Sequence, residues 1–334
     1  MKAVIYTKQG TNQEAVLKIQ DIAKPVPEDH QVLVKVKACS LNVNDYTRFT
    51  TTKSNGKMSF FAKMIDKVQQ APGKPIGGEI AGVVESIGKQ VKNVKIGDEV
   101  FGVTLGSFPN GGLAEFAICS DDLVYQKPES LTFEASSALP ISAITALGAV
   151  RKGKVEPGKK VLIYGSSGGV GQYAIQISKA SGGIITGVCS TRNVEIAQKL
   201  GCSQTIDYKK ADFTKCNDKF DVILGINGYN PLHVYRKLLK PNGIYVSVGG
   251  IKQGIMGGMF GGISSIGSSK KFTGASFAES VKQENALSTI KQLSDTGQVK
   301  PYIDKIYSVN DTVAAIQYIV KYHTHGKVVI KMDI

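Results

Sequence analysis

A short apolar run at residues 161–164 leads into a glycine-rich turn and then a helical pattern, in the sequence VLIYGSSGGVGQYAIQISK. Glycines that follow a strand and open a helix let the backbone approach a pyrophosphate, whose charge then faces free N–H groups and the positive end of the helix dipole. The turn therefore predicts a dinucleotide site, although the spacing alone equally fits a plain tight turn. The residues of this turn that we expect to bind the cofactor are Gly165, Gly168, Gly169, Val170 and Gly171.

The second strand of such a unit ends in VCSTRN, residues 188–193, without the acidic residue that binds the ribose hydroxyls of NAD. Ser190, Thr191 and Arg192 stand in its place. A 2′-phosphate would repel a carboxylate, but a guanidinium group and hydroxyl donors would match it. The segment therefore predicts NADPH rather than NADH. The alternative is that Arg192 is an ordinary surface residue, although a cation at a helix N-terminus opposes the helix dipole.

Later strand ends should also border the cofactor, because ligands of such sheets lie at the carboxyl ends of the strands. Tyr208 follows the third strand in TIDYKK, and we expect it near the adenine. The alternative for Tyr208 is an exposed aromatic residue at a strand end. The segments GING and SVGG end two further strands, and we expect cofactor contacts from Asn227 and Gly249 within them.

These candidate residues need a sheet to position them, and the sequence alternates between strands and helices from residue 159 onward. Strands are expected at residues 159–165, 184–190, 204–208, 220–227 and 244–250, and helices at 169–181, 193–201 and 232–243. Such alternation predicts an α/β fold with a doubly wound parallel sheet and right-handed crossovers. A helical pattern at residues 132–152 precedes this unit, with a break or kink expected at Pro140.

The first third of the chain has a different rhythm, with short alternating segments separated by Gly, Pro and Asn. This pattern predicts a small β-barrel or sandwich. The tail, residues 301–332, predicts an amphipathic helix and a final strand. We expect two domains, one of residues 1–124 to which residues 299–334 return, and a cofactor domain of residues 125–298. The Gly- and Ser-rich residues 254–269 predict a mobile loop.

The composition of the chain limits the classes of partner that the protein is expected to bind. The net charge is +14, but the lysines are spread along the chain without a basic run, so no nucleic-acid partner is expected. The five cysteines form no CxxC pair, which argues against disulfides and against a structural zinc lobe. No apolar run approaches the roughly 18 to 20 residues of a membrane span. The N-terminal residues lack the features of a secretory signal, so a cytoplasmic location is expected.

Several segments together resemble the medium-chain dehydrogenase/reductase superfamily along nearly the whole chain. They are AGVVESIGKQVKNVKIGDEVFG, GGLAEFA, ALPISAITAL, the glycine-turn segment and the closing HGKVVI. The resemblance is strongest to the zinc-free quinone oxidoreductases, and especially to the plant-type quinone and enone oxidoreductase homologues. It implies that the β-rich domain is GroES-like, that the cofactor domain is of the Rossmann type, and that the protein forms a homodimer.

The resemblance also indicates that the catalytic zinc of the related alcohol dehydrogenases is missing, so no metal residues are expected. Those enzymes use an early Cys and a Gly-His-Glu triplet, whereas this chain has SLNVND and the triplet Gly77, Gly78, Glu79. Oxygen ligands alone would make a poor zinc site. Hydride transfer to a quinone or a conjugated carbonyl needs no Lewis acid, provided hydrogen-bond donors stabilise the oxygen that becomes negative.

In the quinone oxidoreductases, the segment matching LNVNDYTR contributes an Asn and a Tyr to the substrate side of the nicotinamide. Carried over, these are Asn42 and Tyr46, with Tyr46 as the expected donor to the developing enolate. The alternatives are that Tyr46 packs in the barrel and that Asn42 forms a turn. Thr145 matches a family residue near the nicotinamide ribose, and its alternative is an ordinary helix threonine.

The sequence thus predicts an NADPH-dependent reductase of quinones or α,β-unsaturated carbonyls. A quinone reductase with little enone activity fits equally, and an NADPH-binding sensor or RNA-binding protein on the same fold is the non-enzymatic alternative. Residues 51–75 form an insert that is longer and more apolar than in the plant-type relatives, with Phe60, Phe61, Met64 and Ile65 spaced either to line a pocket mouth or to pack on the barrel.

Overall fold

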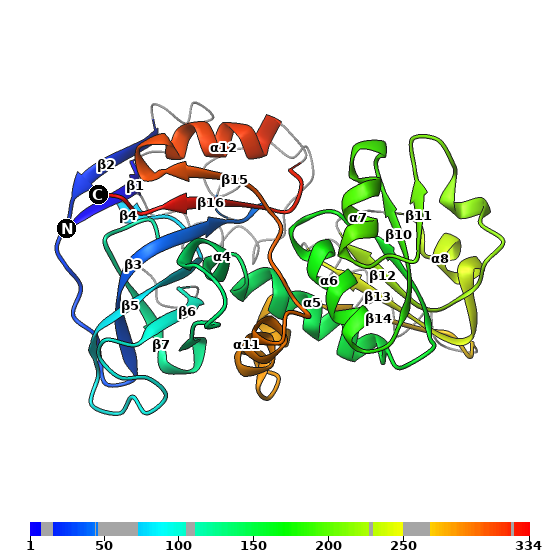
Figure 1. Cartoon of the computed structure of the whole chain (residues 1–334), viewed down its shortest axis with the longest axis horizontal. Coiled ribbons are helices and arrows are strands. Elements are labelled where there is room, and N and C mark those ends of the chain that lie inside the picture. The colour runs from blue at the N-terminus through cyan, green and yellow to red at the C-terminus, as the bar shows by residue number, and fades with distance from the viewer. Residues whose placement is uncertain are drawn as a thin grey trace, which may run out of the picture. The chain divides into compact units, whose positions relative to one another are not determined.

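The computed structural model describes residues 1–7, 16–43, 45, 73–104, 111–226, 230–249, 268–321 and 324–334. The chain divides into two units, unit 1 with Met1–Pro140 and Ile303–Ile334, and unit 2 with Ile141–Tyr302 (Figure 1). Most of the insert at residues 51–75 and most of the Gly- and Ser-rich residues 254–269 lie outside the described residues. In the part of the chain that is described, no helix is both long and apolar enough to cross a membrane.

Unit 1 is built on β-strands, as the alternating pattern predicts. A three-stranded sheet has the order β2-β1-β4, and a larger sheet has the order β15-β16-β3-β5-β6-β8, with β7 paired to β3. The strands are β1 (Lys2–Tyr6), β2 (Leu17–Asp21), β3 (Gln31–Leu41), β4 (Lys74–Pro75), β5 (Glu79–Ile87), β6 (Glu99–Val103), β7 (Phe116–Ser120), β8 (Val124–Gln126), β15 (Ile303–Ser308) and β16 (Lys327–Lys331). In the described part of unit 1, the helices are η1 (Asp121–Leu123), α4 (Phe133–Ser137), η4 (Val309–Asp311) and α12 (Thr312–Lys321).

Strand β3 lies at the centre of the larger sheet because β-branched residues alternate toward the core. Val32, Val34 and Val36 are buried in one cluster with Ile80 of β5 and Ile330 of β16. This packing fixes the register of the sheet, since a slip by one residue would turn the apolar side chains to the other face. Two consequences matter for the site: Ser40 pairs with Glu79 on one side of β3, and Leu41 pairs with Val328 on the other.

Unit 2 contains a parallel sheet with the strand order β11-β10-β9-β12-β13-β14. This is the doubly wound order of dinucleotide-binding folds, and it confirms the predicted α/β class. The strands are β9 (Lys160–Tyr164), β10 (Ile184–Cys189), β11 (Gln204–Asp207), β12 (Phe220–Ile226), β13 (Leu239–Val248) and β14 (Lys271–Ala275). Among the residues of unit 2 that the structure describes, the helices are α5 (Pro140–Gly153), α6 (Gly169–Ala180), η2 (Thr191–Asn193), α7 (Val194–Leu200), η3 (Phe213–Lys215), α8 (Leu232–Leu238), α10 (Phe277–Ser280) and α11 (Ala286–Asp295).

Two prolines decide where helices begin and end. The expected break at Pro140 is confirmed, because α4 ends at Ser137 and Pro140 is the first residue of α5, a position that needs no N–H donor. The predicted helix over residues 232–243 is wrong in its second half. Helix α8 ends at Leu238 and strand β13 begins at Leu239, because Pro241 cannot continue the helical hydrogen bonds and Asn242 adopts a left-handed φ of 61°.

The core of unit 2 contains a row of aromatic rings. Tyr235 stacks on Tyr245 with ring centroids 4.4 Å apart, and Phe213 lies 5.0 Å from the ring of Tyr164. These rings pack with Leu162 and other apolar residues of the sheet in one cluster. Burial of such large apolar surfaces on one face of the sheet supports the strand ends that form the candidate cofactor site.

Candidate functional site

The glycine turn between β9 and α6 has the geometry of a phosphate-binding turn. Gly165 has a φ of 78°, and a Cβ there would lie 2.1 Å from the carbonyl oxygen of Ile226. A Cβ at Gly171 would lie 2.1 Å from the oxygen of Gly165, so both glycines allow close backbone packing. Among the described residues, a Cβ at Gly168 would meet only the carbonyl oxygen of Gly165, at 3.8 Å. Gly168 is therefore the least crowded of these three glycines.

The first turn of α6 presents backbone donors beside Gly168. Gly168 is the N-cap of α6 and supplies no capping side chain. The N–H groups of the first turn of a helix have no intrahelical acceptor, and they lie at the positive end of the dipole. Gly169, Val170 and Gly171 occupy this turn, so it is suited to bind a pyrophosphate.

Asn193 connects this turn to the end of β10, and sequence reasoning missed it. Its side chain is only 5% exposed, and its Nδ2 donates to Oγ of Ser167 at 2.7 Å and to Oγ of Ser190 at 3.2 Å. Oδ1 of Asn193 is buried and has no hydrogen-bond partner among the described residues. Asn193 occupies the N-cap position of α7, where an Asn side chain often caps the helix, but here the side chain makes no capping hydrogen bond.

The predicted phosphate-binding residues lie at one edge of the parallel sheet. Thr191 and Arg192 are exposed in the short helix η2, directly after β10 and Ser190. Tyr208 follows the neighbouring strand β11 and is 43% exposed, and its N–H donates to the carbonyl of Cys189 at 3.0 Å. The structure thus brings Tyr208 and the residues after β10 together, as expected for adjacent parallel strands.

An acidic residue that the sequence analysis passed over also lies at this edge. Asp207 ends β11 and pairs in register with Cys189 of β10. Hydrogen bonds from Thr191 and from the backbone N–H of Lys209, together with the charges of Lys210 and Lys209, hold the pKa of Asp207 below its usual range. Asp207 is therefore ionised at neutral pH. With Arg192, Lys209 and Lys210 close by in the chain, positive charges still outnumber negative ones here.

The remaining cofactor candidates differ in what the structure says of them. Thr145 is buried in α5, and its hydroxyl donates to the carbonyl of Ile141 at 2.7 Å. Its single hydrogen is thus used, and the oxygen can still accept one from a ligand hydroxyl. Gly249 follows β13, is exposed and has a φ of 100°. Asn227 lies outside the described residues.

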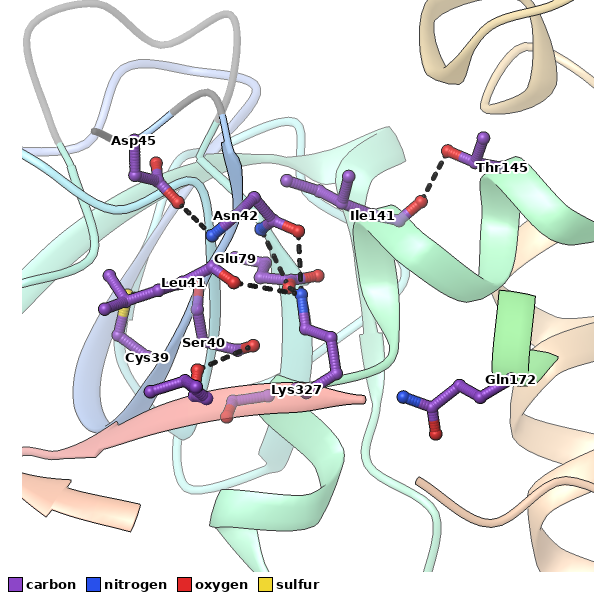
Figure 2. Close-up of polar contacts among 12 residues, drawn as sticks. Cys39, Ser40, Leu41, Asn42, Asp45, Glu79, Ile141, Thr145, Gln172 and Lys327 are labelled. Carbon is purple, nitrogen blue, oxygen red and sulfur yellow. Dashed lines mark hydrogen bonds and ion pairs between the residues drawn. The ribbon is translucent and has the colours of Figure 1, made fainter. Parts of the chain in front are cut away.

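In unit 1, a buried ion pair holds the predicted substrate-side residue Asn42 (Figure 2). Nζ of Lys327 lies 2.6 Å from Oε1 of Glu79, and the two side chains are 2% and 0% exposed. The same ammonium donates to Oδ1 of Asn42 at 2.7 Å and to the carbonyl of Leu41 at 3.2 Å. Nδ2 of Asn42 donates to Oε1 of Glu79 at 2.9 Å. Sequence reasoning missed Lys327 entirely.

The turn after Asn42 is also fixed by hydrogen bonds. The N–H of Asn42 donates to Oδ2 of Asp45 at 2.7 Å, and the N–H of Asp45 donates back to the carbonyl of Asn42 at 2.9 Å. Asn42 is therefore a turn residue and a member of a buried polar cluster at once. The other predicted catalytic residue, Tyr46, lies outside the described residues.

The cluster around Asn42 is poorly suited to bind a metal ion. Across the described ranges, no three His, Cys, Asp or Glu side chains gather in the way a metal ion requires. Cys39 lies near the cluster, but its burial, together with the negative charges of Asp45 and Glu79, raises the pKa of its thiol well above the usual value. A neutral thiol is a weak ligand and a weak nucleophile.

Comparison with known proteins agrees with this architecture. Residues 28–129 match the family described as alcohol dehydrogenase GroES-like domain, and residues 200–330 match the family described as zinc-binding dehydrogenase. The chain is 31% identical to quinone-oxidoreductase QR1, chloroplastic, of Triphysaria versicolor, over 99% of this chain and 98% of that protein. It is 32% identical to 2-methylene-furan-3-one reductase of Solanum lycopersicum, over 99% of this chain and 79% of that protein.

A solved structure shares the whole fold. The quinone oxidoreductase from Coxiella burnetii superposes with a TM-score of 0.82 at 30% sequence identity, and the match covers 99% of both chains. The doubly wound sheet of unit 2 and the GroES-like unit 1 are thus those of its relatives. The chain belongs to the medium-chain dehydrogenase/reductase superfamily, in its quinone oxidoreductase group, a group of nicotinamide-dependent oxidoreductases.

Proposed function

We propose that the protein is an NADPH-dependent, zinc-independent reductase of quinones or α,β-unsaturated carbonyls. The observation that carries the proposal is the turn of unit 2, in which a Cβ at Gly168 would meet nothing closer than 3.8 Å among the described residues, beside an N-terminus of α6 without a capping side chain. The relatives named for quinone and methylene-furanone reduction support the substrate class. The quinone and the enone are both electrophiles conjugated to an oxygen, so one site chemistry serves both.

The positive charge at the sheet edge supports NADPH as the cofactor. A 2′-phosphate carries about two negative charges near neutral pH, and the guanidinium of Arg192 together with the hydroxyl of Ser190 matches it. The hydroxyl of Thr191 contributes less than the sequence indicates, because its hydrogen is given to Asp207. Gly165, Gly169, Val170 and Gly171 would hold the pyrophosphate, and Tyr208, Thr145, Asn227 and Gly249 would lie along the rest of the dinucleotide.

Zinc does not fit the described residues around Asn42. The carboxylate of Glu79 is engaged by the Lys327 ammonium at 2.6 Å, so a divalent cation would meet a positive charge where it needs a ligand. The amide of Asn42 is a weak ligand compared with the Cys and His side chains that zinc prefers. Elemental analysis of the purified protein is expected to give well under one zinc per chain, and stoichiometric zinc would contradict this part of the proposal.

The chemistry divides between the cofactor and the side chains of unit 1. When bound, NADPH supplies a hydride equivalent to the electrophilic carbon of the substrate. Negative charge then develops on the substrate oxygen, and the amide N–H of Asn42 is suited to donate a hydrogen bond to it. The hydroxyl of Tyr46 would donate to the same oxygen and would supply, directly or through water, the proton for the adjacent carbon.

The test is turnover measured with two substrates side by side. The purified chain is incubated with NADPH and either an acrolein-type enone or a naphthoquinone, and cofactor oxidation is followed. Turnover with at least one substrate is expected, and Tyr46→Phe should lower it by about tenfold or more. An absence of turnover with both substrates would contradict the proposal. It would favour the non-enzymatic alternative, a sensor or an RNA-binding protein, which the net charge of +14 supports.

A further inference from the structure

The ion pair between Lys327 and Glu79 is placed by the sheet and not by local sequence. Glu79 begins β5 and pairs with Ser40, whereas Lys327 begins β16 next to the residue that pairs with Leu41. The two residues therefore lie on the strands that flank the end of β3, and their side chains meet beside Asn42. Three chain segments far apart in sequence meet at the side-chain amide of this one residue.

A contribution to stability does not by itself explain why Lys327 and Glu79 are buried as an ion pair. The side chains are 2% and 0% exposed, and removing two charges from water costs about as much as their attraction returns. Apolar residues of similar volume often do as well or better in such positions. A buried pair is better attested as a device that fixes one arrangement of its neighbours.

The ammonium of Lys327 has no proton to spare for a substrate. It carries three N–H donors, and three acceptors surround it: Glu79 at 2.6 Å, Asn42 at 2.7 Å and the carbonyl of Leu41 at 3.2 Å. A role as the proton donor of the reaction would break this arrangement. Lys327 acts instead through what it contacts.

The two charges select one orientation of the Asn42 amide. Its oxygen accepts from the ammonium and its nitrogen donates to the carboxylate. The flipped amide would place its NH₂ group against the ammonium and its oxygen against the carboxylate, both repulsive. One of the two amide hydrogens is given to Glu79, so the fixed orientation leaves the other as a donor with a defined direction.

We propose that Lys327 and Glu79 are positioning residues that fix the Asn42 amide with one N–H available for the substrate oxygen. The identity of that oxygen rests on the proposed function. The orientation of the Asn42 amide rests only on its contacts with Lys327 and Glu79. A donor held in place before the reaction stabilises developing charge better than one that must reorient. Neither Lys327 nor Glu79 needs to touch the substrate.

The test compares a neutral pair with loss of the amide itself. Lys327→Met alone leaves a buried carboxylate without its partner and is expected to fold poorly, so Lys327→Met/Glu79→Leu is the main variant. We expect it to lower kcat by at least about tenfold without raising KM for NADPH. Adding Asn42→Ala to this variant should then cost nothing further, whereas Asn42→Ala in the wild type should lower kcat by the full factor. The proposal would be overturned if Lys327→Met/Glu79→Leu left kcat unchanged. It would also be overturned if adding Asn42→Ala to that variant lowered kcat by the same factor as in the wild type.

A second measurement is independent of turnover. The side-chain NH₂ resonances of Asn42 in ¹⁵N-labelled protein, assigned by their loss in Asn42→Ala, should be well separated in the wild type and should collapse or broaden in Lys327→Met/Glu79→Leu. Unchanged resonances would overturn the positioning role even if the protein reduces no substrate. Conversely, shifted resonances in a protein without turnover would leave the positioning role standing and remove the proposed function.

Lys127 offers a matched control for both measurements. It is also a buried lysine of unit 1, 8% exposed, and it pairs with Glu99 at 3.2 Å. Lys127→Met should lower stability as a loss of a buried charge does, yet leave kcat and the Asn42 resonances as in the wild type. A similar loss of turnover in Lys127→Met would assign the effect to the fold and contradict the proposal.

Discussion

The glycines of the turn after β9 have different tasks, and the space around each separates them. Gly165 needs its left-handed φ of 78° and lies against the carbonyl of Ile226. Gly168 has an ordinary φ, and among the described residues a Cβ there would meet no atom closer than 3.8 Å. Gly165→Ala is therefore expected to destabilise the protein by at least about 1 to 3 kcal/mol.

Gly168→Ala should instead leave the melting temperature of the ligand-free protein nearly unchanged and weaken NADPH binding. The added methyl group occupies the space that the pyrophosphate would take. Calorimetric titration with NADPH and thermal unfolding of the two variants check this contrast. Equal binding by Gly168→Ala and the wild type would remove the turn from the cofactor site.

Arg192 and Asp207 should shift cofactor preference in opposite directions. Loss of a charged hydrogen bond of about 1.5 to 3 kcal/mol predicts that Arg192→Ala raises KM for NADPH by about 10- to 150-fold, with a much smaller effect on NADH. Asp207→Asn removes a negative charge from the same edge and should lower KM for NADPH. Lys199→Ala, which removes a charge from the exposed part of α7, is the control. An equal change for both cofactors in Arg192→Ala would contradict the phosphate assignment.

Candidate residues that one continuous segment positions could be identified from the sequence. Residues that are brought together by the pairing of distant strands could not. The glycine turn and the Ser190 to Arg192 segment are read from consecutive letters because one strand, one turn and one helix determine them. Lys327 and Asp207 reach the candidate sites only because β16 pairs with β3 and β11 pairs with β10. The role of Asn193 likewise depends on the packing of the turn, because its side chain contacts Ser167 and Ser190. The roles of all the predicted site residues stay predictions, and Tyr46 and Asn227 also lie outside the described residues.

At the scale of elements, helix α6 holds the chain that follows α11 through two buried glutamines. Gln172 exchanges two hydrogen bonds with the backbone of Tyr302, at 2.6 and 3.2 Å. Gln176 does the same with Lys300, at 2.8 and 3.0 Å. The amides imitate the backbone pairing of a strand, so α6 anchors this segment. Helical periodicity marks these positions as buried but does not reveal the polar pairing.

Replacing these glutamines by leucine should loosen that segment selectively. Each of Gln172→Leu and Gln176→Leu loses two hydrogen bonds, or about 1 to 3 kcal/mol of unfolding free energy. Hydrogen exchange at Lys300 and Tyr302 should accelerate more than exchange in the sheet. Gln198→Leu, which loses an exposed bond to Thr205 at 3.4 Å, is the control and should change little. Uniform acceleration through unit 2 would mean that the glutamines support the whole unit and not this segment.

At the scale of the whole molecule, both units bury thiols, so alkaline pH is expected to destabilise both of them. Burial raises the pKa of Cys119 in unit 1 to about 12 and that of Cys202 in unit 2 to about 12, from an ordinary value of 9.0. Burial also raises the pKa of Tyr235 and of Tyr245 in the core of unit 2. All these groups are neutral when protonated, so the folded state holds protons that the unfolded state releases.

The unfolding free energy should therefore be insensitive to these groups below pH 9 and should fall as pH rises above it. Because the folded state binds more protons than the unfolded state, each thiol contributes a loss of about 1.4 kcal/mol per pH unit between its two pKa values. Urea unfolding between pH 8 and pH 10.5, followed separately for the two units if they unfold in two steps, measures the slope. Cys119→Ala should reduce the slope in unit 1, whereas Val124→Ala, a comparable core truncation without a titrating group, should lower stability and keep the slope. If both variants retain the wild-type slope, the thiol of Cys119 does not hold its proton in the folded protein as its burial requires.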